Sequence, residues 1–435
     1  MRLSDYTQSG GRGLFRRDRR LYDQRGTFTF TVPEGVTQIW GFAIGAGGGA
    51  NTAEAMTASK KIIGGGKGGG YASGIISGLT PGNTLTITVG AGGIGKINYG
   101  SATAGADTTV VGGSTTYLQG EGGGAGGVEE NSITDQKGQG GTAATSSVTD
   151  GYTAAGGGSG SASVNSGPAS DIATGGGASG NPFGTGMGGG KAVQLNNNNI
   201  ATGGGGWAQK DFPHTETIEL DGSLSIANGF GWPGYGSHNP PSTFFFSLNT
   251  DGENGSGNDY PMSMRGGNGR SAKGGISLMC ENYLGNYFDG GQYQENTVLN
   301  YYKAMADIVG GDANPNWWFP WEIDGGGGGG SRFSNYYSPF IAGDGGPGGG
   351  GGGCGCDGGA EGGGTLKAGD GGFGGGGGGM YAKNGASIPA NHNFIASGGN
   401  GGNGGGGGAA KGPIGGGNYL PVGGNGGDGC VGLYW

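Results

Sequence analysis

The sequence predicts a mostly β and irregular fold: a small antiparallel β module followed by a sandwich of packed polyglycine II helices with long aromatic loops. Three observations predict this class. Of the 435 residues 123 are glycine, about four times the average share, and many stand in blocks such as 325–330 and 374–379. Between residues 26 and 120 several short runs alternate apolar and polar residues, which is the period of a half-buried strand. The aromatic residues gather in inserts between the glycine blocks.

The composition excludes several classes of protein. Hydrophobic residues make up 32% and charged residues 12% of the chain, so a large conventional core is excluded. The glycines stand in solid blocks rather than at every third position, which excludes a collagen triple helix. Aromatic residues are usually scarce in disordered chains, so the 16 Phe, 18 Tyr and 7 Trp favour an ordered structure.

Residues 1–25 are predicted to be a basic N-terminal attachment arm. They hold seven arginines against three aspartates, a charge of +4, and because the whole chain carries −9 the remaining residues carry −13. An acidic body does not suit nucleic-acid binding, whereas a basic arm suits docking on an acidic partner. Apolar residues at 14, 15, 21 and 22 predict a short amphipathic helix over residues 12–22, with a merely solvated helix as the alternative. The expected attachment residues are Arg12, Leu14, Phe15, Arg16, Arg17, Arg19 and Arg20.

Residues 26–120 are predicted to form the antiparallel β module. Phe28, Phe30 and Val32 alternate with threonines, and a turn at 33–35 separates this run from a second alternating run at 40–44. The second run leads directly into glycines. Further strands are predicted at 74–79, 85–89, 108–111 and 114–118.

Residues 121–435 are predicted to form a glycine-rich domain of polyglycine II rods. Flexible linkers are the alternative, but linkers mix glycine with serine and rarely recur so often between aromatic inserts. Polyglycine II is a left-handed extended helix of three residues per turn, whose backbone groups point outward. Ordering glycine costs about 1–2 kcal/mol per residue, so only a lattice that pairs nearly every N–H and C=O offsets the cost. Each block is expected to be one rod of roughly ten residues and about 30 Å.

Two long inserts interrupt this domain, at 207–264 and 282–324, and a strand is predicted at 430–435. Both inserts are rich in aromatic residues and are expected to be loops at the ends of the rods. Within the second insert, residues 297–309 have one apolar face and helix-capping residues at both ends, which predicts a short helix.

No catalytic constellation is found in the sequence. The run 90–97 resembles the start of a phosphate-binding loop, but Ile97 stands where a Ser or Thr must hold magnesium. Cys354 and Cys356 lack the two-residue spacing of zinc ligands, and we expect free thiols there. Three scattered histidines offer no partner to a nucleophile. We therefore expect no enzyme, no cofactor and no metal; the enzymatic alternative is a glycan depolymerase, which needs a carboxylate pair about 5–10 Å apart.

Aromatic side chains in the inserts are the candidate binding residues. Rings flanked by Asn, Ser, Gly and Asp give a large contact area at low entropy cost, a composition typical of binding loops. The alternative is that the rings form small loop cores that seal the ends of the rods. The candidates are Trp207, Trp232, Tyr235, Phe245, Trp317, Trp318, Trp321, Tyr336, Tyr337, Tyr381 and Phe394.

Three stretches carry a resemblance to a known family. They are FTFTVPEGVTQI at 28–39, SGLTPGNTLTITVGAGG at 77–93, and GGDG at 426–429 followed by a strand that ends in Trp435. With the later polyglycine blocks, these stretches resemble the glycine-rich tail-fibre and tip adhesin proteins of bacteriophages. The resemblance implies a β base, a polyglycine II sandwich and variable distal loops that bind a receptor on the host surface.

The expected function is therefore that of a tail fibre or tip adhesin, attached to the virion through its N-terminus. The expected partners are other tail or fibre proteins and a host outer-surface protein or glycan, with no nucleic acid and no membrane insertion. A homotrimer is one expected assembly, although no heptad repeat specifies it. The absence of a signal peptide and of an 18-residue apolar run predicts synthesis in the host cytoplasm and a place in the virion tail. The alternative is a purely structural tail or decoration protein whose loops contact neighbouring subunits.

Overall fold

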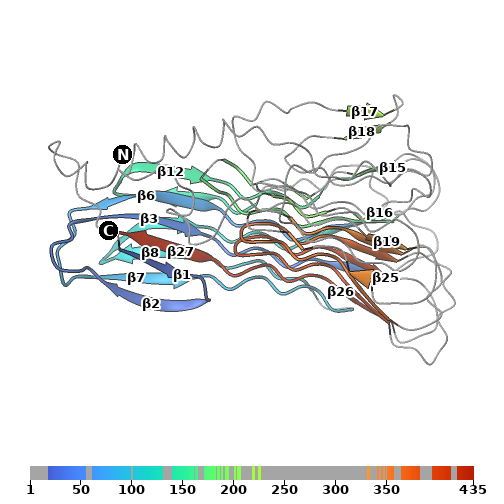
Figure 1. Cartoon of the computed structure of the whole chain (residues 1–435), viewed down its shortest axis with the longest axis horizontal. Coiled ribbons are helices and arrows are strands. Elements are labelled where there is room, and N and C mark those ends of the chain that lie inside the picture. The colour runs from blue at the N-terminus through green and yellow to red at the C-terminus, as the bar shows by residue number, and fades with distance from the viewer. Residues whose placement is uncertain are drawn as a thin grey trace.

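The computed structural model describes residues 18–54, 61–98, 101–130 and 140–160 and, with gaps, 162–206, 218–226, 331–356 and 364–435. The molecule is elongated (Figure 1). A sandwich of two antiparallel sheets lies at one end, extended glycine segments run through the middle, and short strands lie toward the other end. The described residues contain strands and no helix, so the predicted mostly β class is confirmed.

The first sheet of the sandwich joins distant parts of the chain. Its strands, all antiparallel, are in order β1 (Arg19–Tyr22), β27 (Cys430–Tyr434), β3 (Gln38–Ile44), β6 (Tyr71–Ser77) and β12 (Val148–Ala154). Leu433 in β27 lies opposite Arg20 on one side and Gly41 on the other. The strand from the end of the sequence is therefore central, and β1 is at the edge.

The second sheet contains strands that are closer together in sequence. Its order is β11 (Ala143–Thr145), β9 (Thr115–Gly120), β8 (Thr108–Gly112), β7 (Thr84–Val89) and β2 (Gly26–Thr31). β2 pairs with β7 along its whole length without a register shift and forms one edge of the sheet.

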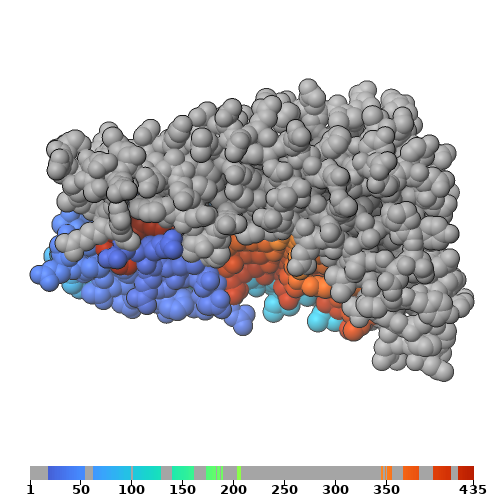
Figure 2. Space-filling model, in the orientation of Figure 1, coloured from blue at the N-terminus to red at the C-terminus, as the bar shows by residue number. Residues whose placement is uncertain are grey.

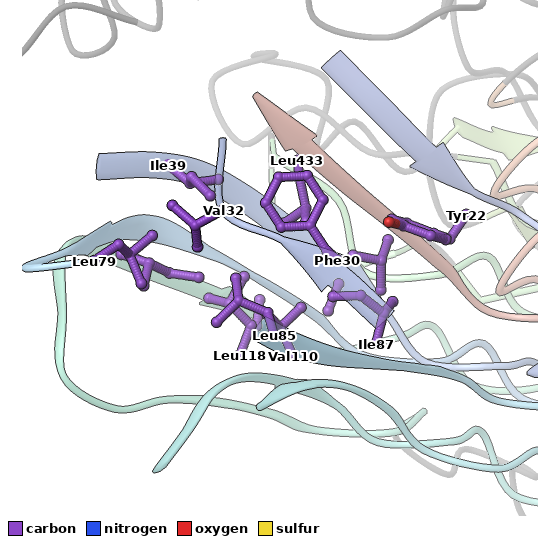
Figure 3. Close-up of a cluster of buried hydrophobic side chains, with 14 of the residues drawn as sticks. Tyr22, Phe30, Val32, Ile39, Leu79, Leu85, Ile87, Val110, Leu118 and Leu433 are labelled. Atoms are coloured by element: carbon purple, nitrogen blue, oxygen red, sulfur yellow. The ribbon is translucent and has the colours of Figure 1, made fainter. Parts of the chain in front are cut away.

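The main hydrophobic core lies between the two sheets (Figure 3). Phe30 and Ile87 enter it from the second sheet, and Ile39 and Leu433 enter it from the first. In β2 the threonines at 29 and 31 are exposed while Phe30 is buried, as the alternating sequence requires. Burial of each such side chain contributes about 1.5–3 kcal/mol. The remaining buried members are Tyr22, Val32, Val36, Ala43, Ala72, Ile76, Leu79, Leu85, Val89, Val110, Leu118 and Val431.

The strands that the alternating runs predict are confirmed, with boundaries that differ by a few residues. The helix predicted over 12–22 is wrong in its described part, because residues 19–22 form β1. A backbone ladder to β27 is available there, and Tyr22 is buried in the core. The helix predicted over 297–309 lies outside the described residues.

The strands of the sandwich continue into glycine rods that hydrogen-bond in three directions. The rod after β3 bonds to a different neighbour at each residue and returns to the first neighbour after three, which is the repeat of polyglycine II. The donor and acceptor pairs are Gly47 to Gly427, Gly48 to Lys67, Gly49 to Thr103 and Ala50 to Gly424, with N···O distances from 2.8 to 2.9 Å. Backbone pairing through the lattice therefore takes the place of a side-chain core, as the composition predicts.

At many positions the rods are packed too closely for any side chain. A Cβ atom built on Gly66 would lie 1.8 Å from the carbonyl oxygen of Gly48, and one on Gly377 would lie 2.0 Å from that of Gly399. Glycine is required at these positions because another backbone occupies the space of the side chain. Glycine segments at 45–50 and 64–70 already belong to this lattice. The division into a β module at 26–120 and a glycine-rich domain at 121–435 stays a prediction.

Rods after residue 344 are joined in pairs by tight turns, here called the inner turns. In two of them the N–H of Gly375 donates to the Gly372 carbonyl, and the N–H of Gly405 donates to the Gly402 carbonyl, both at 2.7 Å. Gly374 and Gly404 each have a φ of 76°, which favours glycine at the third turn position. The turns stack, because Gly374 and Gly404 each donate the backbone N–H to the next turn or rod.

Short strands continue the rods at the end away from the sandwich. Strands that point away from the sandwich, here called outbound, form a parallel sheet of β19 (Ser331–Phe333), β21 (Cys354–Cys356), β23 (Met380–Ala382), β25 (Ala410–Gly412) and β4 (Thr52–Glu54). Inbound strands form another parallel sheet of β20 (Phe340–Ile341), β22 (Gly364–Lys367), β24 (Phe394–Ser397) and β26 (Tyr419–Val422). Equivalent strands align because the rods below them are in register.

The remaining strands form smaller sheets. One contains β10 (Val128–Glu130), β5 (Lys61–Ile63), β14 (Asp171–Ala173) and β16 (Ile200–Ala201). β13 (Ala162–Val164) pairs in parallel with β15 (Ala192–Gln194), and β17 (Ile218–Leu220) pairs with β18 (Leu224–Ile226) as a hairpin.

A ladder of Asp and Asn side chains covers one outer layer of rods. The repeated sequence G-[D/N]-G-G-x-G places Asp344, Asp370, Asn400 and Asn425 on successive rods. Each side-chain Oδ1 accepts from the next backbone N–H: Asp344 from Asp370 at 2.6 Å, Asp370 from Asn400 at 2.6 Å, Asn400 from Asn425 at 2.9 Å, and Asn425 from Gly95 at 2.8 Å. The ladder provides these N–H groups with acceptors at the surface of the lattice.

Replacing one member of this ladder tests its contribution. We expect Asn400→Leu to lower the free energy of unfolding by about 0.5–1.5 kcal/mol, because the N–H of Asn425 loses its acceptor. Asn400→Asp keeps the side-chain oxygen and gives this position the same side chain as Asp370, its equivalent on the neighbouring rod. It should therefore lower the free energy of unfolding by less. Chemical denaturation of both variants measures the difference, and equal stabilities would show that the side-chain oxygen contributes nothing.

Candidate binding surfaces

The first candidate surface is the arginine-bearing edge of the sandwich. Arg19 and Arg20 lie in β1 and are exposed, and Arg25 is exposed just before β2. Backbone bonds between Asp18 and Trp435, at 3.1 and 3.0 Å, extend the β1–β27 ladder by one pair. The other predicted attachment residues, Arg12, Leu14, Phe15, Arg16 and Arg17, lie outside the described residues.

Aromatic rings close the side of the sandwich beneath these arginines. The rings of Tyr22 and Phe28 have centroids 5.2 Å apart, and those of Phe30 and Trp435 are 4.9 Å apart. The guanidinium of Arg20 lies 5.2 Å from the centroid of Tyr22, a cation–π contact. Burial raises the pKa of Tyr22, and the charge of Arg20 partly offsets that rise. β1 is thus held by packing as well as by its backbone ladder.

A second group of rings lies on the opposite face of the first sheet. Trp40, Phe42, Tyr71 and Tyr434 are all buried, and the ring of Phe42 stacks on that of Tyr71 with centroids 6.1 Å apart. Burial raises the pKa of both tyrosines, and it raises the pKa of the buried Cys430 thiol well above its usual value. Cys430 is a free thiol in the described structure.

These pKa shifts predict loss of stability in alkali. The folded protein keeps the Cys430, Tyr71 and Tyr434 side chains neutral, whereas the unfolded chain ionises at about pH 8.5 for Cys and about pH 10 for Tyr. Stability is therefore fully present below these values and falls as the pH rises through them. Thermal unfolding from pH 7 to pH 11 measures the fall. In Tyr434→Phe the stability should fall less steeply with pH. An unchanged slope would contradict the assignment of the fall to buried tyrosine.

The second candidate surface is the end of the lattice away from the sandwich, where loops join outbound to inbound strands. Residues 334–339 join β19 to β20 in this way and contain two of the predicted receptor contacts. Most of the predicted contacts lie outside the described residues: Trp207, Trp232, Tyr235, Phe245, Trp317, Trp318, Trp321, Tyr336 and Tyr337. Only the points where their segments meet the lattice are described.

The long insert meets the lattice at a different level. The N–H of Gly205 donates to the Gly176 carbonyl, and the Gly205 carbonyl accepts from the N–H of Gly376, both at 2.8 Å. Gly376 lies two residues after Gly374, which belongs to an inner turn. The rod that contains Gly205 therefore reaches the level of the inner turns at Gly206. The described part of this segment therefore ends at the level of the inner turns.

Tyr381 is corrected by the structure. It lies in β23, in the interior of the outbound sheet, and its side chain is 1% exposed beside Ile63 and Ala409. The Nζ of Lys411 lies 5.5 Å from its ring centroid. A receptor cannot reach this ring, because the strands of the neighbouring sheet cover it. Phe394, the other candidate placed by the structure, begins β24 in the inbound sheet.

Three exposed isoleucines near this end were not predicted from the sequence. Ile94, Ile97 and Ile395 are 63%, 53% and 41% exposed. Ile97 forms a β-bridge with Val422, and β26, which contains Val422, pairs with the strand of Ile395. The sequence does contain a sign of them, because Ile94 and Ile97 are large apolar residues in the glycine-rich run 90–97. From the sequence, only aromatic residues were predicted as candidate contacts.

The described residues contain no group of three or more His, Cys, Asp and Glu side chains that could hold a metal ion. No helix among them is long and apolar enough to cross a membrane. A family model described as a glycine-rich domain matches residues 23–258, more than half of the chain. The chain belongs to this glycine-rich domain family. No curated protein matches the chain.

The match to the glycine-rich domain begins just before β2 and ends inside the first insert. Rods outside the match complete the same lattice. The N–H of Gly407 donates to the Gly48 carbonyl at 3.0 Å, and the N–H of Gly406 donates to the Gly177 carbonyl at 2.8 Å. The glycine-rich domain of this protein therefore packs as one unit with rods from the later part of the chain.

Proposed function

We propose that this glycine-rich protein is a bacteriophage tail-fibre or tip adhesin, attached to the virion at its sandwich end and bound to a host-surface receptor through its loops. One observation supports the proposal most: a lattice of hydrogen-bonded rods separates an arginine-bearing edge at one end from loop-bearing short strands at the other. A stiff spacer of this kind suits a protein that has to hold two partners apart. The proposed activity is binding without a catalytic step.

The lattice also suits loops that vary in sequence. The distal strands align through rods whose register is set by backbone bonds and by the Asp/Asn ladder, so the loop between two strands does not determine the packing below it. Receptor contact is proposed for the loop at 334–339, at the distal strands, and for the aromatic insert, whose preceding rod ends at the level of the inner turns. Either a surface protein or a glycan is the proposed receptor. Other tail or fibre proteins are the proposed partners at the sandwich end.

Binding of the purified full-length protein to host cells tests the proposal. Two variants separate the two loop groups: Tyr336→Ala with Tyr337→Ala, and Trp317→Ala with Trp318→Ala and Trp321→Ala. We expect saturable binding by the wild type and at least about a tenfold loss in one variant or both, because buried rings dominate protein interfaces. Circular dichroism and thermal unfolding confirm that each variant is folded.

The negative outcome has a defined meaning. If the folded wild type, tested also in its native oligomer, does not bind host cells, the adhesin proposal fails. Its presence in purified particles would then support a structural tail or decoration protein whose loops contact neighbouring subunits.

A further inference from the structure

The outer edge of β2 is regular and open among the described strands. β2 is the last strand of its sheet. The N–H of Val32 donates to the Asn83 carbonyl at 2.8 Å, which continues the β2–β7 pairing. Because antiparallel pairs alternate, Thr27, Thr29 and Thr31 direct their N–H and C=O groups away from β7. Their side chains are exposed as well, so another chain has access to this edge.

The edge strands on the opposite side of the sandwich are protected against pairing with another chain. β12 has a register shift between Thr149 and Tyr152, and Ser147 and Asp150 have φ values of 54° and 51°. β11, the other edge of the second sheet, has only three residues. Bulges and short edge strands are the usual protection against pairing with another chain. β2 has six residues, no register shift and no bulge, so it lacks these two protections.

The charge beside β2 indicates the kind of chain that would pair with it. Arg20 on β1 and Arg25 just before β2 are exposed on this side of the sandwich, whereas Arg19 pairs with Tyr434 and lies on the other face of its sheet. The carboxylates near β2 are the exposed Asp18 and Glu34 and the half-buried Asp23. Residues 1–25 carry +4 in total. In Figure 2 the N-terminal residues, coloured blue, form an uncovered surface at this end. An acidic extended segment would gain both backbone bonds and ion pairs here.

We propose that the outer edge of β2 takes up an extended acidic segment of another virion protein as an added strand. The N–H and C=O groups of Thr27, Thr29 and Thr31 bond to the added backbone, and Arg20 and Arg25 contact its carboxylates. The inference rests on the proposed attachment to the virion and specifies how that attachment is made: by strand addition rather than by an amphipathic helix.

A proline at the centre of this edge tests the proposal. Thr29→Pro removes an N–H that points away from β7 and leaves the β2–β7 ladder intact, a position where edge strands tolerate proline. The matched control is Thr29→Val, which keeps the N–H. We expect Thr29→Pro to reduce the copies of the protein in purified particles at least about tenfold, with Thr29→Val at the wild-type level. Quantitative immunoblotting of the particles measures the copies.

A charge-reversal variant tests the partner's chemistry without altering the backbone. Arg20→Glu with Arg25→Glu should also reduce incorporation at least about tenfold, because acidic residues of the partner are then repelled. Thermal unfolding shows whether each variant is folded. Wild-type incorporation of a folded Thr29→Pro variant would overturn the added strand, and wild-type incorporation of the Glu variant would overturn the acidic partner. Absence of the wild type itself from particles would instead overturn the proposed virion function.

Discussion

Gly66→Ala is expected to lower the free energy of unfolding by about 3–5 kcal/mol, a large effect for one methyl group. The new Cβ would lie 1.8 Å from the Gly48 carbonyl oxygen and 3.1 Å from the Gly407 nitrogen, so two rods have to move apart. The N–H of Gly66 donates to the Gly407 carbonyl at 2.7 Å, and that bond is strained by the same movement. Displacement of one rod disturbs its neighbours on every side, because each rod bonds to several others.

Gly124→Ala is the matched control for this effect. The nearest atom to its added Cβ is Lys67 Cδ, at 3.4 Å, and the other close atoms belong to the same flexible side chain. Alanine there loses less conformational entropy on folding, so the variant should be as stable as the wild type or more stable by about 0.4–1 kcal/mol. Denaturant unfolding of both variants gives the comparison. Equal losses at the two positions would show that general glycine flexibility, rather than rod spacing, determines stability.

Removal of residues 430–435 is expected to abolish folding of the sandwich. β27 lies between β1 and β3, so its loss leaves both without a neighbour on that side. Val431 and Leu433 leave the core, and Tyr434 leaves the second ring cluster. At about 1.5–3 kcal/mol for each buried side chain, with the backbone bonds added, the loss approaches the 5–15 kcal/mol that typically stabilises a domain.

Near-ultraviolet circular dichroism of the truncated chain measures this loss through the tryptophan and tyrosine signals. Addition of a synthetic peptide with the sequence of residues 429–435 should restore part of the signal, because the vacant position between β1 and β3 accepts one strand. Removal of Trp435 alone is the control. It leaves β27 in place and should cost only the packing on Phe30 and the backbone bonds to Asp18. A fully folded chain without residues 430–435 would contradict the central role of β27.

The sequence predicts the parts of this fold that depend on local pattern. The alternation around Phe30 and the turn after Val32 are properties of neighbouring residues, and strands form there. The polyglycine blocks predict rods because no other arrangement satisfies so many backbone groups. β1 was predicted as a helix because its partner, β27, lies more than 400 residues away and leaves no mark on the local sequence.

The candidate sites were less predictable for the same reason. Met380–Ala382 is too short for an alternating pattern, so nothing local showed that Tyr381 faces the interior. That the rod before the long insert ends at the level of the inner turns follows from the bonds of Gly205, which depend on how distant rods are aligned. The basic character of the segment that contains β1 can be predicted from composition alone, because charge does not require knowledge of the pairing.

The central position of β27 also constrains the order of events during synthesis. Ile44 in β3 pairs with Cys430, which lies 386 positions later in the chain. At about 5–20 residues per second, the ribosome needs about 20 to 80 s to make the intervening chain. During that interval the first sheet lacks its middle strand, and the apolar side chains of β3 and β6 have no complete layer to join. The sandwich that is encoded first is therefore completed last, after the glycine rods have left the exit tunnel.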